Sequence, residues 1–134
     1  MQLVRFRVDL APGCSLGPGK IDLLEAIARQ GSLTKAAAEL GMSYRYAWLL
    51  IDDLKSSFTE PVTAATVGGK RGGGVELTPF GRDLVTRYRR AYARIESVAR
   101  GQFAPLMKSV RPRGVKPRPA GKGKHRARSI KRGA

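Results

Sequence analysis

The fold is decided by residues 31–55, GSLTKAAAELGMSYRYAWLLIDDLK. Ser32 can cap a helix whose apolar residues recur at helical spacing, and Gly41 can adopt the left-handed conformation that ends it. Ser43 can cap a second helix that starts at once. This stretch therefore predicts two short helices joined by a glycine-centred turn, a helix-turn-helix. The apolar positions of the second helix, three or four residues apart, are Ala47, Leu50, Ile51, Leu54 and Phe58.

The second helix leaves a polar and aromatic edge on or near the side opposite this stripe. The edge carries Tyr44, Arg45 and Trp48, and an edge of this kind is required for docking into the DNA major groove. A pair of helices in any small helical domain could show the same pattern. The flanking sequence must therefore distinguish the two interpretations.

Two short β-prone runs follow the helices, VTAATV at 62–67 and VEL at 75–77, on either side of GGKRGGG at 68–74. Two strands around a basic glycine loop predict a β wing, because glycine permits positive φ and close approach of the backbone to a ligand. Lys70 and Arg71 stand at the tip, where they could reach phosphate or the minor groove. A solvated hairpin tip without a ligand is the alternative.

The remaining segments complete one architecture. Residues 3–10 alternate apolar and charged side chains, which predicts a half-buried strand, and residues 11–19 form a turn region rich in glycine and proline. Residues 20–30 predict a helix. After the wing, Thr78 caps and Pro79 opens a longer helix that reaches about residue 100. The predicted order is β-α-α-α-β-β-α, a mainly α winged helix-turn-helix with a small β wing and a long C-terminal helix.

The last helix is longer than one small domain can cover. Phe80 and Leu84 should pack on the helix-turn-helix, whereas Tyr88, Tyr92 and Ile95 lie beyond its expected reach. An apolar face without an intramolecular partner tends to find an intermolecular one. We therefore expect a homodimer formed through helix 79–100. In the alternative, this stripe folds back onto helix 20–30 or the N-terminal strand.

The charge of +16 is unevenly distributed along the chain. Residues 1–107 hold fifteen of the basic residues and all ten acids, whereas the other eleven basic residues lie from Lys108 onward. The segment 105–134 is also rich in proline and glycine and has few large apolar side chains, so it cannot offset its ordering entropy. We expect a DNA-binding domain at 1–104 and a disordered basic tail at 105–134.

Several function classes find little support in the composition. Cys14 has no partner for an internal disulfide, and the single histidine, His125, lies in the tail, so neither a metal site nor acid-base catalysis is expected. Residues 13–20 faintly resemble a P-loop, but Ile21 replaces its Ser or Thr. With no membrane-length apolar run, and with Arg5 and Arg7 inside the first apolar stretch, we expect a cytoplasmic protein of bacterial type, associated with the nucleoid, without cofactors and without enzymatic activity.

Two segments carry a family resemblance: GSLTKAAAELGMSYRYAWLLIDDL at 31–54, and VGGKRGGGVELTPFG at 67–81. Over residues 3–100 the chain resembles the N-terminal DNA-binding domain of ModE-type molybdate-responsive repressors, which is itself similar to the LysR-type winged helix-turn-helix. The resemblance implies a dimeric DNA-binding domain with a recognition helix that begins at Ser43. The DNA-contacting positions that it implies are Thr34, Lys35, Ser43, Tyr44, Arg45 and Trp48 on the two helices, with Lys70 and Arg71 in the wing.

The chain departs from that family after the last helix. Full-length members continue into small β-rich domains that bind the oxyanion, whereas here the basic tail follows, so we do not expect molybdate binding by this chain. The sequence thus favours a sequence-specific transcriptional regulator whose tail adds non-specific affinity for double-stranded DNA. An architectural, nucleoid-associated protein with little sequence preference is the alternative. RNA binding is a third class of function. The sequence favours it less, because no aromatic sheet on which bases could stack accompanies the basic segment.

Overall fold

The computed structural model describes residues 3–69 and 72–112. Lys70, Arg71 and tail residues 113–134 lie outside this part, so the predictions for the wing tip and for most of the tail are not addressed by it. The chain divides into two compact units, Met1–Phe103 and Ala104–Ala134, and the first holds the site described below. The helices are α1 Pro18–Gln30, α2 Leu33–Leu40, α3 Tyr44–Ser57 and α4 Pro79–Met107, and the strands are β1 Val8–Ala11, β2 Cys14–Leu16, β3 Thr63–Gly69 and β4 Gly72–Leu77.

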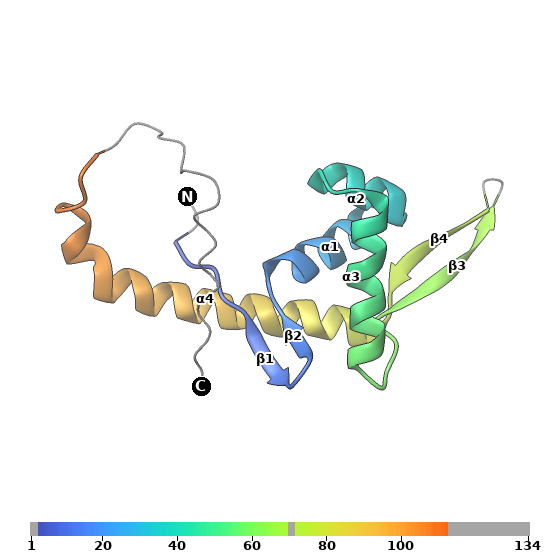
Figure 1. Ribbon diagram of the computed structural model, residues 1–134, viewed down its shortest axis with the longest axis horizontal. Helices are drawn as coiled ribbons and strands as arrows, with labels where there is room; N and C mark the ends of the chain where they lie inside the picture. Colours follow the sequence, from blue (N-terminus) through green and yellow to red (C-terminus); the bar gives the residue numbers. More distant parts are fainter. Residues whose placement is uncertain (1–2, 70–71, 113–134) are drawn as a thin grey trace, which may run out of the picture. The chain divides into compact units, whose positions relative to one another are not determined.

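The fold is mainly helical with a two-stranded antiparallel wing formed by β3 and β4, as predicted. Helix α1 lies at the centre of the core and contacts α2, α3 and β4 (Figure 1). Its leucine and isoleucine side chains are fully buried, and Leu54 of α3 joins them. Burial of each large apolar side chain contributes about 1.5–3 kcal/mol. The fully buried large residues are Ile21, Leu23, Leu24, Ile27 and Leu54.

The predicted helix caps are confirmed. Ser32 Oγ accepts a hydrogen bond of 3.1 Å from the Lys35 amide, and Ser43 Oγ accepts one of 3.0 Å from the Tyr46 amide. Gly41 has a φ of 70°, which is the left-handed conformation that ends α2. These local signals place the turn of the helix-turn-helix where the sequence predicts it.

The N-terminal prediction is wrong in detail. The single strand expected at 3–10 and the turn region expected at 11–19 are replaced by a short hairpin, in which β1 pairs with β2 and Ala11 faces Cys14. Gly13, with a φ of 79°, allows the tight turn between them. Residues 3–7 have no regular secondary structure. The described elements therefore follow the order β-β-α-α-α-β-β-α.

Residues 3–7 instead supply a partner for α4. The Phe6 ring stacks on Tyr88 with a centroid distance of 4.4 Å, and the Tyr88 hydroxyl donates a 2.7 Å hydrogen bond to the Phe6 carbonyl. Tyr88 is 5% exposed, and Tyr92 also stacks on Phe6 at 6.4 Å. The expectation that Tyr88 lacks a partner within its own chain is therefore wrong, and the alternative in which this part of the stripe packs against the N-terminal segment holds for it.

An ion-pair cluster next to this contact joins α4 to α1. Arg89 donates to Glu25 at 2.7 Å and to Asp22 at 3.0 Å. Hydrogen bonding to Glu25 is the main cause of the raised pKa of Arg89, and burial raises the pKa of Tyr88. Side chains from the first half of α4 thus hold both the N-terminal segment and α1 in place.

Removing the Tyr88 hydroxyl is expected to weaken the N-terminal contact. The Tyr88→Phe change keeps the stacked ring but leaves the Phe6 carbonyl without its donor, so the free energy of unfolding should fall by about 1 kcal/mol. Urea unfolding measures the difference. Tyr92→Phe is the matched control, since no hydrogen bond of the Tyr92 hydroxyl exists among the described residues. Equal losses in the two variants would contradict this assignment.

Helix α4 ends at Met107 instead of near residue 100 and includes Pro105. A proline removes one hydrogen bond to the residue four positions earlier, but its own φ is compatible with a helix. The helix can therefore continue through Pro105 for its last turn. The boundary expected at 104 falls inside this helix, one residue from the division between the two compact units.

Candidate nucleic-acid interface

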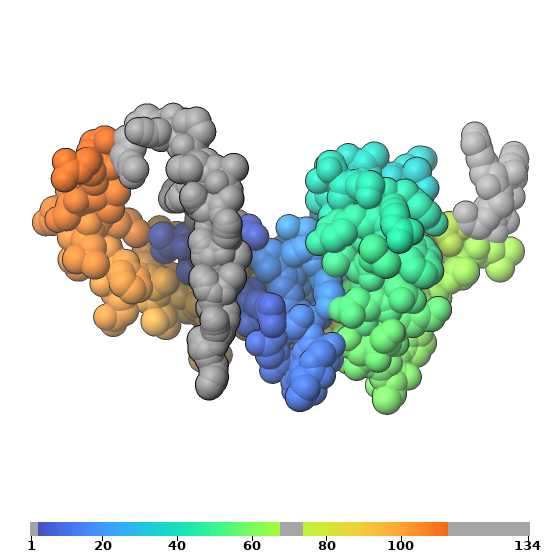
Figure 2. Space-filling model, in the orientation of Figure 1, coloured from blue at the N-terminus to red at the C-terminus, as the bar shows by residue number. Residues whose placement is uncertain are grey.

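The turn between α2 and α3 is compact because its contacts are made by small side chains. Ala36, Ala37 and Ala47 are at most 2% exposed, so the two helices approach each other closely. The amides of Gly41 and Met42 donate to the carbonyls of Ala38 and Ala37 at 3.1 and 3.0 Å. The beginning of α3 thus follows α2 in a fixed geometry, and Figure 2 shows the two helices as one continuous surface.

The predicted contact residues of α3 point away from the core. Tyr44 is 54% and Trp48 47% exposed, and together with Arg45 they line a shallow hollow on the surface. Ser43 is exposed at the start of the helix, while its side chain caps the first turn. The structure therefore brings Tyr44, Arg45 and Trp48 together on one accessible face.

The start of α2 and the base of the wing lie next to this face. Thr34 and Tyr44 line a second hollow together with Gly74 and Val75 of β4. Lys35, one residue further along α2, is exposed. The helical part of the predicted contact set is thus contiguous with the wing, and its tip residues Lys70 and Arg71 fall outside the described residues.

The wing is attached to the end of α1. The Val75 amide donates a 3.1 Å hydrogen bond to the Gly31 carbonyl, and the Gly74 amide donates one of 2.8 Å to Thr66 Oγ1. A Cβ atom at Gly74 would lie 2.3 Å from the Gly31 oxygen, so only glycine fits. The sequence places Gly74 in the glycine loop of the wing and does not predict this contact, for which a glycine next to the first β-branched residue of the strand is the only signal.

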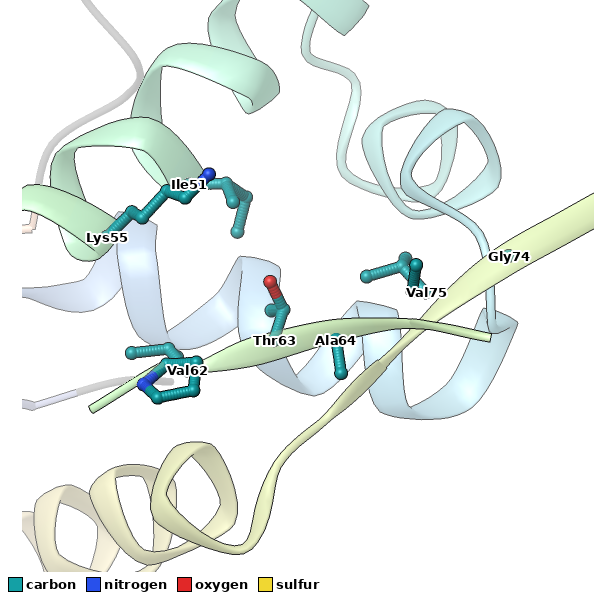
Figure 3. Close-up of a pocket in the computed structure, with 9 residues that line it drawn as sticks. Ile51, Lys55, Val62, Thr63, Ala64, Gly74 and Val75 are labelled. Carbon is teal, nitrogen blue, oxygen red and sulfur yellow. The ribbon is translucent and has the colours of Figure 1, made fainter. Parts of the chain in front are cut away.

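A cavity of about 280 Å³ lies between α3 and the base of the wing (Figure 3). Ile51 and Lys55 of α3 line one side, and the strands supply the other. Among the described residues that line this cavity, Lys55 is the one ionisable group. The described part of the lining contains no pair of groups suited to acid-base catalysis.

The electrostatics of α3 differ between its two ends. Arg45 and, on α2, Lys35 form no salt bridge among the described residues, so both remain available for an anionic partner. Asp53, near the other end of α3, pairs with Lys20, so that the charge of an acid that would repel phosphate is partly neutralised. Glu39 of α2 pairs with Arg29, and hydrogen bonding from this guanidinium lowers the pKa of Glu39. The acids nearest the interface are thus partly neutralised within the fold, although Asp52 is exposed.

Two kinds of feature are absent from residues 3–69 and 72–112. Those residues include no group of three or more His, Cys, Asp or Glu side chains placed to hold a metal ion. No helix among them combines the length and the apolar character needed to cross a membrane.

Comparison with known proteins gives this face a family context. Residues 19–82 match the bacterial regulatory helix-turn-helix protein family of lysR type. The molybdenum transport protein ModE of Azotobacter vinelandii is 41% identical over 87 residues, which cover 65% of this chain and 32% of that protein. The DNA-binding transcriptional dual regulator ModE of Escherichia coli K12 is 37% identical over 71 residues, 53% of this chain and 27% of that protein. The molybdenum-pterin-binding protein MopB of Rhodobacter capsulatus is 42% identical over 76 residues, 57% of this chain and 28% of that protein.

The match to these relatives spans about a third of their length or less. Two of these relatives are named ModE, so the resemblance to the ModE-type DNA-binding domain, drawn from residues 31–54 and 67–81, is confirmed. The matched family segment contains α2, α3 and the wing.

Proposed function

We propose, from the premise that residues 19–82 are a helix-turn-helix domain of the lysR family, that this protein is a DNA-binding transcriptional regulator. Helix α3 enters the major groove with Tyr44, Arg45 and Trp48 foremost, while Thr34 and Lys35 contact the backbone. The wing tip, with Lys70 and Arg71, reaches phosphate or the minor groove. Ser43 fixes the first turn of the recognition helix.

The observation that carries this proposal is the exposed face of α3. Three large side chains, two of them aromatic and about half exposed, cluster at the start of a capped helix, beside the start of α2 and the base of the wing. Leaving such apolar surface in water is unfavourable, whereas the major groove is wide enough to accept a helix and its side chains. Arg45, which forms no salt bridge within the described part of the chain, supplies charge complementarity to DNA.

We also propose that the protein binds DNA as a homodimer through the second half of α4. Tyr92 is partly covered by Phe6, but Ile95 is 38%, Val98 66% and Phe103 53% exposed. Ile95 and Phe103 are separated by eight residues, slightly more than two helical turns, so they fall near one face of the helix. A two-fold dimer would place two recognition helices about one DNA turn apart.

The decisive experiment is a binding-site selection from random duplexes, performed with residues 1–134 and with residues 1–112. A regulator should enrich one motif with both proteins and retain a specificity ratio of about 10³ at physiological salt. The residues 113–134 carry nine Lys and Arg, and each phosphate that they neutralise should add about 0.9 to the slope of log K against log salt. If neither protein enriches a motif, the architectural function replaces the regulatory one.

Truncation of Arg45 and truncation of Lys35 to alanine are expected to change DNA binding in different ways. Arg45→Ala should weaken binding to the selected duplex by about tenfold to hundredfold and relax the preference at one base pair, because arginine is the usual reader of guanine. Lys35→Ala should weaken binding to selected and scrambled duplexes alike, because a phosphate contact carries no base information. Fluorescence anisotropy with both duplexes measures this difference. Identical behaviour of the two variants would contradict the division between base and backbone contacts.

A further inference from the structure

We infer that the recognition face of α3 selects its DNA sequence through the 5-methyl groups of thymines, next to a guanine bound by Arg45. This inference rests on the proposed function and specifies its substrate, a duplex whose half-sites place thymines beside a guanine. The inference follows from the aromatic side chains that α3 exposes and from the hydrogen-bonding side chains that its first two turns lack.

The first two turns of α3 contain very few groups that can read a base by hydrogen bonding. In residues 44–51, YRYAWLLI, Arg45 is the only charged residue, and Asn, Gln, Asp and Glu are absent. Adenine is usually read by Asn or Gln and cytosine by Asp or Glu, whereas guanine is read by Arg or Lys. The first two turns of α3 therefore have a reader for guanine and none of the usual readers for adenine or cytosine.

What α3 offers instead is apolar surface around the arginine. Tyr44 and Trp48 are one helical turn apart, are about half exposed and line the same hollow as Arg45. Asp52 is one further turn along from Trp48 and is exposed, so the apolar part of this face ends there. A single hollow thus combines two aromatic side chains with one guanidinium.

The thymine methyl is the one apolar group that the four base pairs present in the major groove. Placing it against an aromatic side chain removes apolar surface of both partners from water, which is favourable by about the same amount as burying one methylene group. Adenine, guanine and cytosine offer no equivalent group to Tyr44 or Trp48. The exposed aromatic side chains therefore favour thymine without the need for a hydrogen bond.

The test replaces thymine by deoxyuridine, which lacks the methyl group but keeps its hydrogen-bonding edge. The full chain is first used to select a duplex, and each thymine of that duplex is then substituted in turn. At one or two positions per half-site, binding should weaken about fourfold for each methyl removed. A selected duplex that tolerates complete replacement by deoxyuridine would overturn the inference while leaving the proposed function intact. Failure to select any duplex would count against the proposed function itself.

Two variants of α3 test whether the proposed face contacts the thymine methyl groups. Trp48→Ala should abolish the deoxyuridine effect at one position, so that thymine and deoxyuridine duplexes bind equally there. Tyr46 is the matched control, because it is a similarly exposed aromatic residue, 52% against 47%, that is about 200° around the helix from Tyr44. Tyr46→Ala should keep the full effect.

The Tyr44 hydroxyl could contribute a hydrogen bond in place of an apolar contact. Tyr44→Phe removes only the hydroxyl and should preserve the ratio of dissociation constants between deoxyuridine and thymine duplexes at its position, whereas Tyr44→Ala should bring it to one. Loss of the ratio in Tyr46→Ala, or its persistence in both Trp48→Ala and Tyr44→Ala, would show that another surface contacts the methyl groups.

Discussion

Replacing Gly81 by alanine is expected to lower the free energy of unfolding by about 3 kcal/mol. A Cβ atom at this position would lie 2.2 Å from the Val62 carbonyl oxygen, well inside van der Waals contact. That carbonyl cannot move freely, since it accepts a 3.0 Å hydrogen bond from the Thr78 amide and Val62 is 3% exposed. Relief of the clash must therefore displace the first turn of α4 from the base of the wing.

Gly101 on the same helix is the matched control. Apart from its chain neighbours and the nearby backbone of α4, none of the described residues has an atom within 4 Å of a Cβ atom built there, so Gly101→Ala should raise the free energy of unfolding by about 0.5–1 kcal/mol through helix propensity. Urea unfolding of the two variants beside the wild type gives both values. A loss of less than about 1 kcal/mol in Gly81→Ala would show that the contact between α4 and Val62 yields easily.

Introducing a charge at Ile95 should dissociate the proposed dimer. In a two-fold interface, Ile95→Glu places two unpaired carboxylates in an apolar contact, which should weaken self-association about hundredfold. Binding to a duplex with two half-sites should fall by about hundredfold as well, because the second recognition helix no longer binds at high effective concentration. Sedimentation velocity and anisotropy measure the two effects.

Ser97→Glu adds the same charge at an exposed position two residues further along α4, about 200° around the helix. It should leave the sedimentation coefficient unchanged and reduce DNA affinity only through its general electrostatic effect. A wild-type monomer at micromolar concentration would refute the dimer. Equal DNA binding losses in both glutamate variants would show that charge, not dissociation, is responsible.

The sequence predicted the parts of this fold that are determined by neighbouring residues. Ser32, Gly41 and Ser43 place the ends of two helices through contacts that span three or four residues, and Thr78 followed by Pro79 places the start of α4 in the same way. Such contacts can be inferred from spacing alone. The exposed face of α3 follows from the same periodicity.

The parts that were missed depend on contacts between distant residues. Phe6 and Tyr88 are 82 residues apart, so nothing in the local pattern indicates that they stack. The second strand of the N-terminal hairpin, β2, has only three residues, too few for a visible alternation. The predicted end of the last helix near residue 100 is too early, because the sequence does not show that the remaining hydrogen bonds of α4 can accommodate Pro105.

Because the wing is attached to Gly31, the direction of the hairpin is determined independently of the residues at its tip. The direction of β4 is fixed by a hydrogen bond to the last turn region of α1 and by the close approach at Gly74, both of which are near the base. The sequence between Thr66 and Gly74 is therefore free to vary without redirecting the hairpin. Replacing this tip by that of a relative should transfer the relative's preferences for contacts to the DNA backbone, provided that Gly31 and Gly74 are both kept.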